Sequence, residues 1–418
     1  WGNMYGFLKG MKHDSSIVPL SLADLKPLLK ESKSLDKRIR HIEKKEIGKI
    51  NHKMEKHRLA LKSLERETQS DSILRKIGSI KAEVEELETL YTEKVDTLTN
   101  LYTSAKEKKV IIQLADGREH ILPIFQIIRI YGPNQMGIYA KSCFYVQKFW
   151  EFVSSEPREA NTEGGVFPAI FGTVIMVLIM SLAVTPLGVI TAVFLREYTS
   201  DNIFSRIVRI SVNNLAGVPS IVFGVFGLGF FIYFIGGGID KMFYSEALPT
   251  PTFGTGGILW ASLTLALLTV PVVVVATEEG ISSVPNSLKE ASYGLGATKF
   301  ETLWRVILPQ ATPGILTGMI LAMARAAGEV APLMITGVVK LAPSLPLDSY
   351  SPFIHLERKF MHLGFHIYDV GFQSPNVEAA LPMVYTTTLI LLLTVLSLNL
   401  VAIIVRNKLR KKYVTSAL

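Results

Sequence analysis

The order of apolar and polar positions divides the chain into a charged first part and an apolar second part, which meet near residue 165. Apolar residues recur three and four positions apart over about 35–68 and 73–108, as on amphipathic helices that pack against each other. Two β-rich runs follow, on either side of Asp116-Gly117, a dipeptide typical of a tight turn. This pattern predicts an antiparallel helical hairpin of coiled-coil character and a small β-hairpin.

The second part contains apolar stretches that are each long enough to cross a bilayer. We place these five spans at residues 167–195, 207–235, 257–277, 314–339 and 382–405. The sequence therefore predicts an all-α, multi-span membrane protein. Residues 1–165 would form an extramembrane domain with the helical hairpin, and residues 166–410 would form the transmembrane domain.

Basic residues in the short loops predict how the spans are oriented. Loops 196–209, 278–310 and 406–418 together carry eleven Lys and Arg, against four in 236–255 and 340–381. The positive-inside rule puts the first three segments, and with them the C-terminus, in the cytoplasm. An odd number of spans then places residues 1–165 on the outer side. The chain begins at Trp1 without an initiator methionine; if it is a truncated product, an upstream span would have carried residues 1–165 across the membrane.

Composition and charge narrow the possible classes of protein. The chain is 49% hydrophobic and 19% charged, which is too apolar for an ordinary soluble protein of 418 residues. The single cysteine, Cys143, excludes an internal disulfide and a multi-cysteine metal site. The net charge of +8 does not indicate a nucleic-acid partner, because the basic residues of the first part are interleaved with almost as many acidic ones.

The loop over residues 278–310 carries clear signals for helix starts and stops. Pro285 suits the first turn of a helix, and Gly296 suits a left-handed stop. Thr298 and Glu301 have capping-box spacing, and we expect the helix that they begin to end at Pro309. The signals predict two short helices joined at a glycine, either held as a rigid knob or lying as an amphipathic pair at the membrane interface.

This loop resembles the EAA loop of ABC importer permeases. The resemblance rests on Glu290-Ala291-Ser292, Gly296 and Val306-Ile307-Leu308-Pro309, with Ser292 in place of the second alanine. It implies the type I ABC importer permease fold and a coupling helix that docks on a dimeric ATPase. Glu290 and Ala291 would contact that ATPase, Gly296 would turn the chain, and Thr298 and Glu301 would start the second helix. No G-x-x-x-x-G-K-[ST] motif occurs, so ATP and Mg would bind the partner and no cofactor is expected on this chain.

The segment 324–333, Ala-Arg-Ala-Ala-Gly-Glu-Val-Ala-Pro-Leu, is similar to permeases of the bacterial phosphate-specific transport (Pst) system, the A-type permease more than its C-type partner. The charged first part looks like the extra segment of long forms of the A-type permease. The resemblance implies a multi-pass permease of the bacterial inner membrane, with residues 1–165 in the periplasm. Its partners would be a second permease of the C type, the ATPase and a periplasmic phosphate-binding protein.

Arg325 and Glu329 are the candidate residues of the substrate path. Their spacing puts them one turn apart on one helix face, near the middle of the fourth predicted span. Charges at that depth are costly and usually serve a function. We expect Arg325 to meet the phosphate oxyanion with its planar fork of donors and Glu329 to hold or release it. The alternative is an ion pair that only fixes helix packing.

Two other functions fit parts of the sequence. The same architecture could import another oxyanion, such as sulfate or molybdate. A membrane signalling protein could pass a signal inward from the helical hairpin, but it would need a sizeable output domain after the last span, and only about a dozen residues follow Val405. Phosphate import is therefore the leading prediction, and enzymatic activity on this chain is not expected.

Overall fold

The computed structural model places the elements in two compact units, Trp1–Ser142 and Cys143–Leu418. It describes residues 5–13, 16–66, 71–114, 116–132, 134, 136–158, 161, 163–199, 202–349, 351–375 and 377–415. The division comes earlier than the boundary after Gly165 that the sequence suggested. The reason is that Phe152 and Val153 pack against the same cluster as Val166, at the start of the membrane unit.

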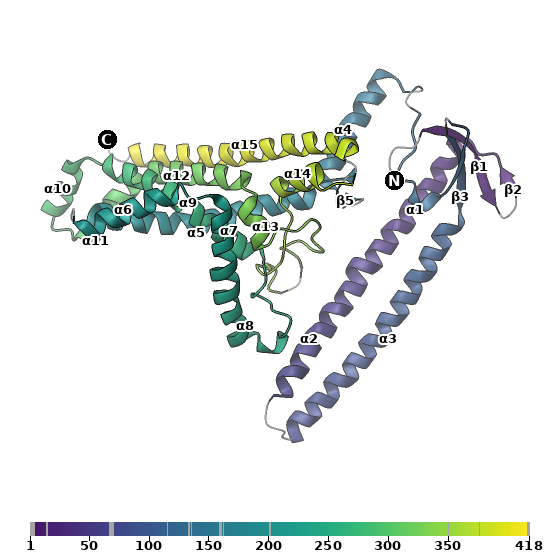
Figure 1. The fold of residues 1–418 in the computed structure, drawn as a ribbon, viewed down its shortest axis with the longest axis horizontal. Coiled ribbons are helices and arrows are strands. Elements are labelled where there is room, and N and C mark those ends of the chain that lie inside the picture. Colours follow the sequence, from purple (N-terminus) through teal and green to yellow (C-terminus); the bar gives the residue numbers. More distant parts are fainter. Residues whose placement is uncertain are drawn as a thin grey trace. The chain divides into compact units, whose positions relative to one another are not determined.

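The first unit contains an antiparallel sheet in the order β2-β1-β3-β4 (Figure 1). Its strands are β1 (Gly6–His13), β2 (Ser16–Val18), β3 (Lys109–Leu114) and β4 (Glu119–Pro123). Strands β3 and β4 form the predicted β-hairpin, and Gly117 takes a φ of 84° in its turn. Strands β1 and β2 were not predicted, because residues 1–34 show no clear period.

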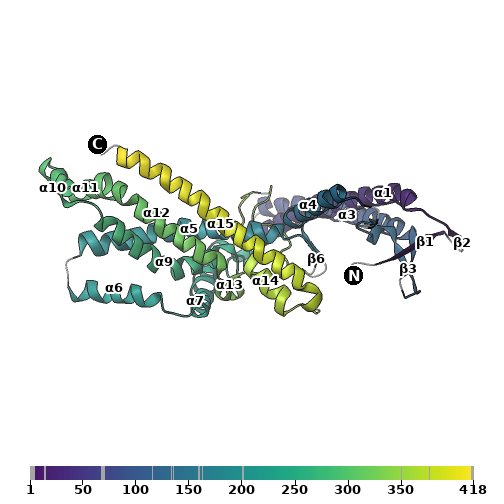
Figure 2. The ribbon, with the colours of Figure 1, turned by 90° about the horizontal axis from the view of Figure 1, so that it is seen from above.

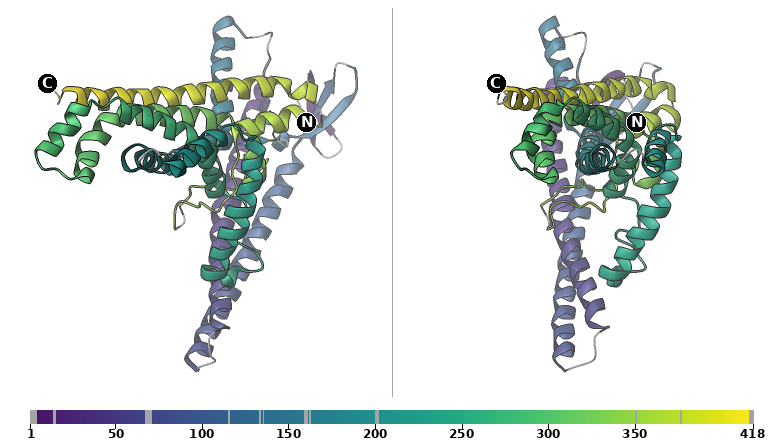
Figure 3. Two further views of the ribbon diagram at one scale, coloured as in Figure 1. Left: turned by 60° about the vertical axis from the view of Figure 1, so that its left-hand side comes forward. Right: turned by 90° about the vertical axis from the view of Figure 1, so that its left-hand side faces the viewer.

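The helical hairpin of the first unit begins earlier than predicted. One arm contains α1 (Leu22–His41), the π-helical turn η1 (Ile42–Ile47) and α2 (Gly48–Leu64), and the other arm is α3 (Asp71–Glu107). Polar side chains join the arms: Lys94 Nζ lies 2.8 Å from Glu46 Oε2, and the Tyr102 hydroxyl donates to Glu43 Oε1 over 2.8 Å. The long paired arms are visible in Figure 3.

The base of the hairpin is joined to the sheet by a small apolar core. Leu25 of α1, Val110 of β3 and Ile124 of the short 3₁₀ turn η2 (Ile124–Gln126) are its buried members. Burying apolar side chains between helix and sheet is the main source of stability for such a unit. Further along the arms, ion pairs between Glu46 and Lys94 and between His57 and Glu83 also link the two helices.

The second unit confirms an all-α, multi-span membrane protein. Among the described residues, five helices are long and apolar enough to cross a membrane: Phe167–Tyr198, Ser220–Phe243, Ile258–Ser282, Lys299–Gly328 and Ala380–Leu409. The elements within them are α5 (Phe167–Val193), η5 (Phe194–Tyr198), α7 (Ser220–Phe226), η6 (Gly227–Gly236), α8 (Gly237–Phe243), α9 (Ile258–Ser282), α11 (Lys299–Thr302), η8 (Leu303–Ile307), α12 (Leu308–Gly328) and α15 (Val377–Thr415).

Shorter elements complete this unit and the link to it. They are α4 (Ile138–Ser154), β5 (Pro157–Arg158), β6 (Glu163–Gly164), α6 (Ile203–Leu215), η7 (Ser245–Ala247), α10 (Asn286–Gly294), α13 (Ala331–Thr336) and α14 (Leu363–Phe372). Figure 2 shows α10 and α11 at one end of the bundle and α14 towards the other. We call residues 278–310 the coupling loop, after the role that the resemblance implies, and the end of the bundle with α10 and α11 the coupling-loop end.

The predicted span 207–235 is wrong in its boundaries. Its first part belongs to α6, a separate amphipathic helix that Asn202 caps through a capping box with Ser205. The chain leaves the helical conformation before Pro219, which has no N–H to continue the ladder, and α7 then begins at Ser220. From α7 to α8 the helix runs across the direction of α5, α9 and α12 (Figures 1 and 2).

The predicted span 314–339 is also wrong as a single helix. Helix α12 ends at Gly328, Glu329 is extended with φ −78° and ψ 136°, and the short helix α13 follows. Pro332 lies in the first turn of α13, where a missing N–H costs no helical hydrogen bond. The fourth span is therefore the continuous helix Lys299–Gly328, and the residues after it form a break.

The core of the membrane unit lies around α9, which packs against both α5 and α12. Its buried cluster includes Met176 and Met180 from α5, Leu265 from α9 and Ala326 from α12. The loop after α13 returns to the start of α9, where Ile258 N donates a hydrogen bond to the Arg358 carbonyl over 2.9 Å. These contacts hold α5, α9 and α12 as one block, with the coupling loop at one end and the α12–α13 break near the other.

Candidate functional site

The loop between α9 and α12 has the predicted two-helix form. Helix α10 ends at Gly294, and Gly296 takes a φ of 85°, which opens the turn into α11. The Thr298 hydroxyl accepts from Glu301 N over 3.3 Å, and Thr298 N donates to Glu301 Oε2 over 2.9 Å, so the predicted capping box is present. Pro309 does not end the second helix, because the wider π turn η8 carries α11 into α12 without a break.

The coupling loop presents polar and apolar groups to the outside of the bundle. Glu290, Ala291, Gly296 and Thr298 are exposed, and Glu301 is half-buried. Large apolar side chains are exposed beside them: Leu295 (90%), Phe300 (63%) and Trp304 (64%). The rings of Phe300 and Trp304 stack with their centroids 6.4 Å apart. Exposed apolar groups that gather on a charged loop are typical of a contact surface for another protein.

A partly buried ion pair holds the coupling loop onto the first span. Lys289 Nζ lies 2.6 Å from Glu197 Oε1, and these side chains are only 18% and 11% exposed. The hydroxyls of Ser292 and Thr302 are 2.8 Å apart and join the two short helices. Removing one partner would leave the other charge largely withdrawn from water without a counter-charge, which is destabilising. The loop is therefore fixed to the end of α5 as well as to α12.

Sequence reasoning missed Glu197. It stands in Arg196-Glu197-Tyr198, directly after the first apolar stretch, where a charged residue is expected for the membrane boundary alone. The available signal was that Glu197 and Lys289 carry opposite charges in two loops that the sequence places on the same side of the membrane. The sequence alone does not show which of the basic residues in these loops pairs with Glu197, because that depends on how the helices pack.

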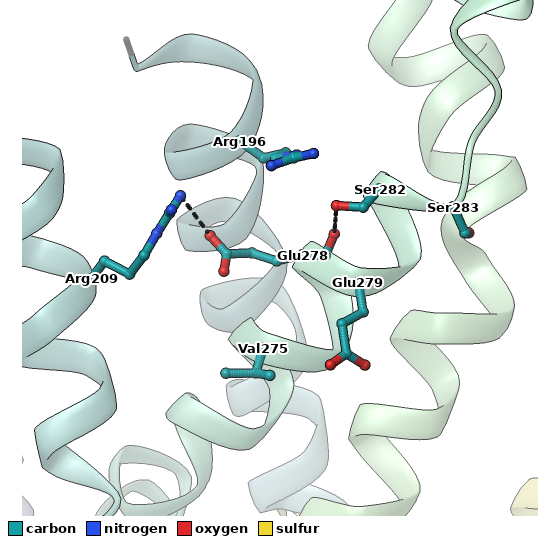
Figure 4. A pocket seen from close by; sticks show the side chains of 7 residues that line it. All are labelled: Arg196, Arg209, Val275, Glu278, Glu279, Ser282 and Ser283. Atoms are coloured by element: carbon teal, nitrogen blue, oxygen red, sulfur yellow. Dashed lines mark hydrogen bonds and ion pairs between the residues drawn. The ribbon is translucent and has the colours of Figure 1, made fainter. Parts of the chain in front are cut away.

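A polar pocket lies near the coupling-loop end, between η5, the middle of α6 and the C-terminal end of α9 (Figure 4). Arg209 from α6 and Glu278 from α9 face each other across it, with Nη2 and Oε1 3.5 Å apart. The lining residues are Arg196, Arg209, Val275, Glu278, Glu279, Ser282 and Ser283. The balance of two arginines against two glutamates gives this open pocket no strong preference for an anion.

Arg325 and Glu329 do come together, but not as predicted. Arg325 lies in the last turn of α12 and Glu329 lies just beyond the helix, so the pair is at its end and not in the middle of a span. Arg325 Nε and Glu329 Oε1 are 3.8 Å apart, which is too long for a hydrogen bond. The side chains are 38% and 22% exposed. The guanidinium therefore keeps donors available beside a helix break.

A second broken helix meets the first at this level. Helix α7, which begins after the interruption at Pro219, packs against α13. At Gly224 a Cβ atom would stand 2.7 Å from Pro332 Cα, so the two backbones are in close contact. In membrane transporters, discontinuous helices often surround the substrate, because their free backbone groups and helix ends can bind it.

A buried polar cluster lies on α14 and was not predicted. Lys340 Nζ is 3.1 Å from Asp369 Oδ2, and Asn161 Nδ2 donates to the Lys340 carbonyl over 2.8 Å. Burial lowers the pKa of His362 to about 3 and that of His366 to about 4, since the charged imidazole would be desolvated. The spacing of His362, His366 and Asp369 on one helix face was the available signal.

Comparisons with known proteins agree with this architecture. The family model described as "Binding-protein-dependent transport system inner membrane component" matches residues 184–414. The chain is 32% identical over 289 residues to the "Probable ABC transporter permease protein YqgI" of Bacillus subtilis, a match that covers 68% of this chain and 87% of the relative.

Two further relatives have phosphate in their names. The chain is 38% identical over 187 residues to the "Phosphate transport system permease protein PstA 1" of Mycobacterium tuberculosis, which covers 45% of this chain. It spans about half of that relative, 55% of its length. It is 30% identical over 237 residues to the "Phosphate transport system permease protein PstC" of Mesorhizobium japonicum, covering 54% of this chain and 71% of that protein.

Proposed function

Because this chain belongs to the family of binding-protein-dependent transport system inner membrane components, we propose that it is a permease subunit of an ATP-driven importer of inorganic phosphate. The membrane unit forms half of the translocation path, and alternating access moves the anion inward. This chain is not an enzyme in the proposal, since a separate ATPase binds ATP with Mg and hydrolyses it. Within the Pst system, the chain corresponds to the A-type permease in its long form.

The observation that carries this proposal is the coupling loop. It is a two-helix knob with exposed Glu290, Leu295 and Phe300, and a partly buried ion pair fixes it to the bundle. An ATPase dimer that closes on ATP can push on such a knob and move the helices behind it. Glu290 and Ala291 contact the ATPase, while Gly296, Thr298 and Glu301 maintain the angle between α10 and α11.

The substrate path is supported by the position of Arg325 at the α12–α13 break. A loose contact of 3.8 Å with Glu329 leaves guanidinium donors for an oxyanion. Arginine suits a phosphate oxyanion, because its planar fork donates two parallel hydrogen bonds. Glu329 competes with the anion for Arg325, so a change at the break can switch Arg325 between the two. Relatives named as phosphate transport permeases favour phosphate over other oxyanions.

The remaining components and the orientation follow from this proposal. Five spans are few for an enclosed path, so a second permease of the C type supplies the other half. The ATPase dimer binds in the cytoplasm, where the coupling loop and the C-terminus lie. A periplasmic phosphate-binding protein delivers the anion from the other side, where residues 1–165 are placed.

The deciding experiment is ATP-dependent uptake of labelled phosphate and labelled sulfate into vesicles that carry this chain with its partner subunits. We expect uptake of phosphate and not of sulfate. Glu290→Ala should lower uptake strongly, whereas Glu378→Ala, a matched change at an exposed glutamate in the first turn of α15, should leave it nearly unchanged. Uptake of sulfate alone would replace the substrate and keep the architecture.

Two variants of Arg325 test the path. Arg325→Gln removes the charge and the fork, and we expect phosphate uptake to fall at least about tenfold, the equivalent of about 1.4 kcal/mol. Arg325→Lys keeps the charge but loses the bidentate geometry, so it should retain part of the uptake. Normal uptake by Arg325→Gln at an unchanged protein level would show that the pair only fixes helix packing. An intact, ATPase-bound complex without any uptake would favour the signalling function.

A further inference from the structure

Helix α4 has a wide apolar face that the described part of the chain leaves mostly uncovered. At 100° per residue, most of its large apolar residues fall on one half of the helix surface, and Phe144 is the exception. Three of them are strongly exposed in the second unit: Tyr145 (75%), Val146 (66%) and Trp150 (69%). Ile138, Tyr139 and Phe149 lie on the same half and are also exposed. Exposed apolar surface of this extent normally marks a contact with another protein or with a membrane.

The opposite half of α4 carries most of its charged and polar residues. Lys141, Gln147 and Lys148 are exposed there, and Glu151 accepts from Arg158 Nη2 over 2.9 Å. The helix has 17 residues, the lower limit for a span, and carries Lys141, Lys148 and Glu151; it is not among the candidate spans. A short helix with aromatic residues on one face and lysines on the other is typical of a segment that lies in the plane of a membrane interface.

Backbone hydrogen bonds fix the level of α4 relative to the first span. Val166 N donates to the Phe152 carbonyl over 2.8 Å, and Phe167 N donates to the Ser155 carbonyl over 3.2 Å. Phe167 is the first residue of that span. The last turn of α4 therefore lies directly beside the point where the chain enters the membrane, at the end of α5 remote from the coupling loop.

The direction of α4 is also that of a helix lying at the membrane surface. The part of α4 that belongs to the second unit runs across the direction of α15 in Figure 1, and so along the membrane plane if the bundle crosses it. Trp and Tyr prefer membrane–water interfaces, because their rings are apolar and their N–H or O–H groups stay hydrated. Lysines on the polar face can reach the phosphate groups of lipid headgroups.

The backbone hydrogen bonds tie α4 to the start of the first span, and its residues follow an amphipathic pattern. We therefore propose that α4 is an interfacial anchor whose aromatic face is buried in the lipid headgroup region of the membrane. The apolar face of α4 is covered by the same bilayer that the second unit spans. The anchor holds the link between the two units against the membrane surface. This inference depends on the membrane location of the second unit and not on which substrate is transported.

The test is electron paramagnetic resonance of spin labels on α4, in the full chain with the subunits that co-purify with it, reconstituted into phosphatidylethanolamine–phosphatidylglycerol liposomes. The single cysteine is replaced first, by Cys143→Ser. Val146→Cys and Phe149→Cys then place labels on the apolar half, and Ala140→Cys and Gln147→Cys place matched labels on the polar half. Accessibility to oxygen, which concentrates in lipid, is compared with accessibility to a water-soluble nickel chelate.

We expect the ratio of oxygen to nickel accessibility to be several-fold higher at 146 and 149 than at 140 and 147. High nickel accessibility at all four positions would overturn the proposal, because α4 would then lie in water. Low accessibility to both reagents at 146 and 149 would overturn it as well, because a protein would cover the apolar face. Transport is not measured, so failure of the proposed phosphate import would not change the outcome.

Discussion

Gly296 is the residue at which the shape of the coupling loop depends on a single backbone angle. Its φ is 85°, and a Cβ atom there would meet nothing within 4 Å, so Gly296→Ala has only a conformational cost, about 1–2 kcal/mol. We expect this variant to bind the ATPase more weakly in a titration of the solubilised complex. Gly294→Ala is the matched control: it also has open space but no positive φ. Equal affinity of both variants for the ATPase would contradict the role of the turn.

The buried histidines of α14 predict that acid destabilises this part of the protein. Burial holds the pKa of His362 and His366 far below 6.5, so the folded state stays neutral while the unfolded chain takes up protons. The full stability is present above pH 6.5 and falls as the pH drops towards 4, by about 1.4 kcal/mol per pH unit and histidine. Lys340 and Asp369 face this cluster and partly offset each other.

Hydrogen exchange at the amides of α14, corrected for the intrinsic rate, measures this loss between pH 7.5 and 5. His366→Phe removes one of the two titrations and keeps most of the volume, so the dependence on pH should become about half as steep. Protection that stays constant with pH in the unmodified protein would rule out the mechanism.

The residues found from the sequence are those whose structure depends on near neighbours. Thr298 and Glu301 are three residues apart, and Gly296 needs only its own backbone angle, so local rules were sufficient to predict their roles in the fold. Glu197 and Lys289 are 92 residues apart, and nothing local distinguishes them from other charged residues. Which charge pairs with which is decided by the packing of whole helices.

At the scale of elements, hydropathy located each of the membrane helices in the described part of the chain but not the breaks within two of the predicted spans. A window average does not distinguish a continuous helix from two helices with a short turn between them, because Val218-Pro219 is apolar and Glu329-Val330 adds only one charge to an apolar stretch. The prolines were visible, but a proline can bend a membrane helix or end it, depending on whether neighbours satisfy the freed backbone groups. The predicted pair Arg325 and Glu329 was displaced to a helix end for this reason.

The contact between α7 and α13 gives a prediction for the two broken helices. In Gly224→Ala the added Cβ would stand 2.7 Å from Pro332 Cα, which forces the helices apart and should cost about 1–3 kcal/mol. Thermal unfolding of the purified protein should show a lower midpoint. Gly229→Ala, in the same continuous helix with nothing within 4 Å, should leave it nearly unchanged. Similar midpoints for both variants would mean that the two helices are not held together at this point.

At the scale of the whole molecule, the proposed orientation can be tested with cysteines on opposite sides. In a Cys143→Ser background, Ser79→Cys on the exposed surface of α3 should react with a membrane-impermeant maleimide in intact cells with a permeable outer membrane. Ser287→Cys on the coupling loop should react only after the inner membrane is opened. Labelling of Ser287→Cys in intact cells would reverse the orientation.

The attachment of the coupling loop has a mechanical consequence. A force on α10 loads α5 through Lys289 and Glu197, and it loads α12 through the continuous backbone. Both helices press on α9, so the three tilt as one stiff lever instead of bending near the loop. Helix α12 has 21 residues, about 32 Å at 1.5 Å each, so a tilt of about 5° would swing its far end by about 3 Å. That swing is about the length of a hydrogen bond, so a small stroke at one end would be enough to remake contacts between the far end of α12 and elements outside the lever.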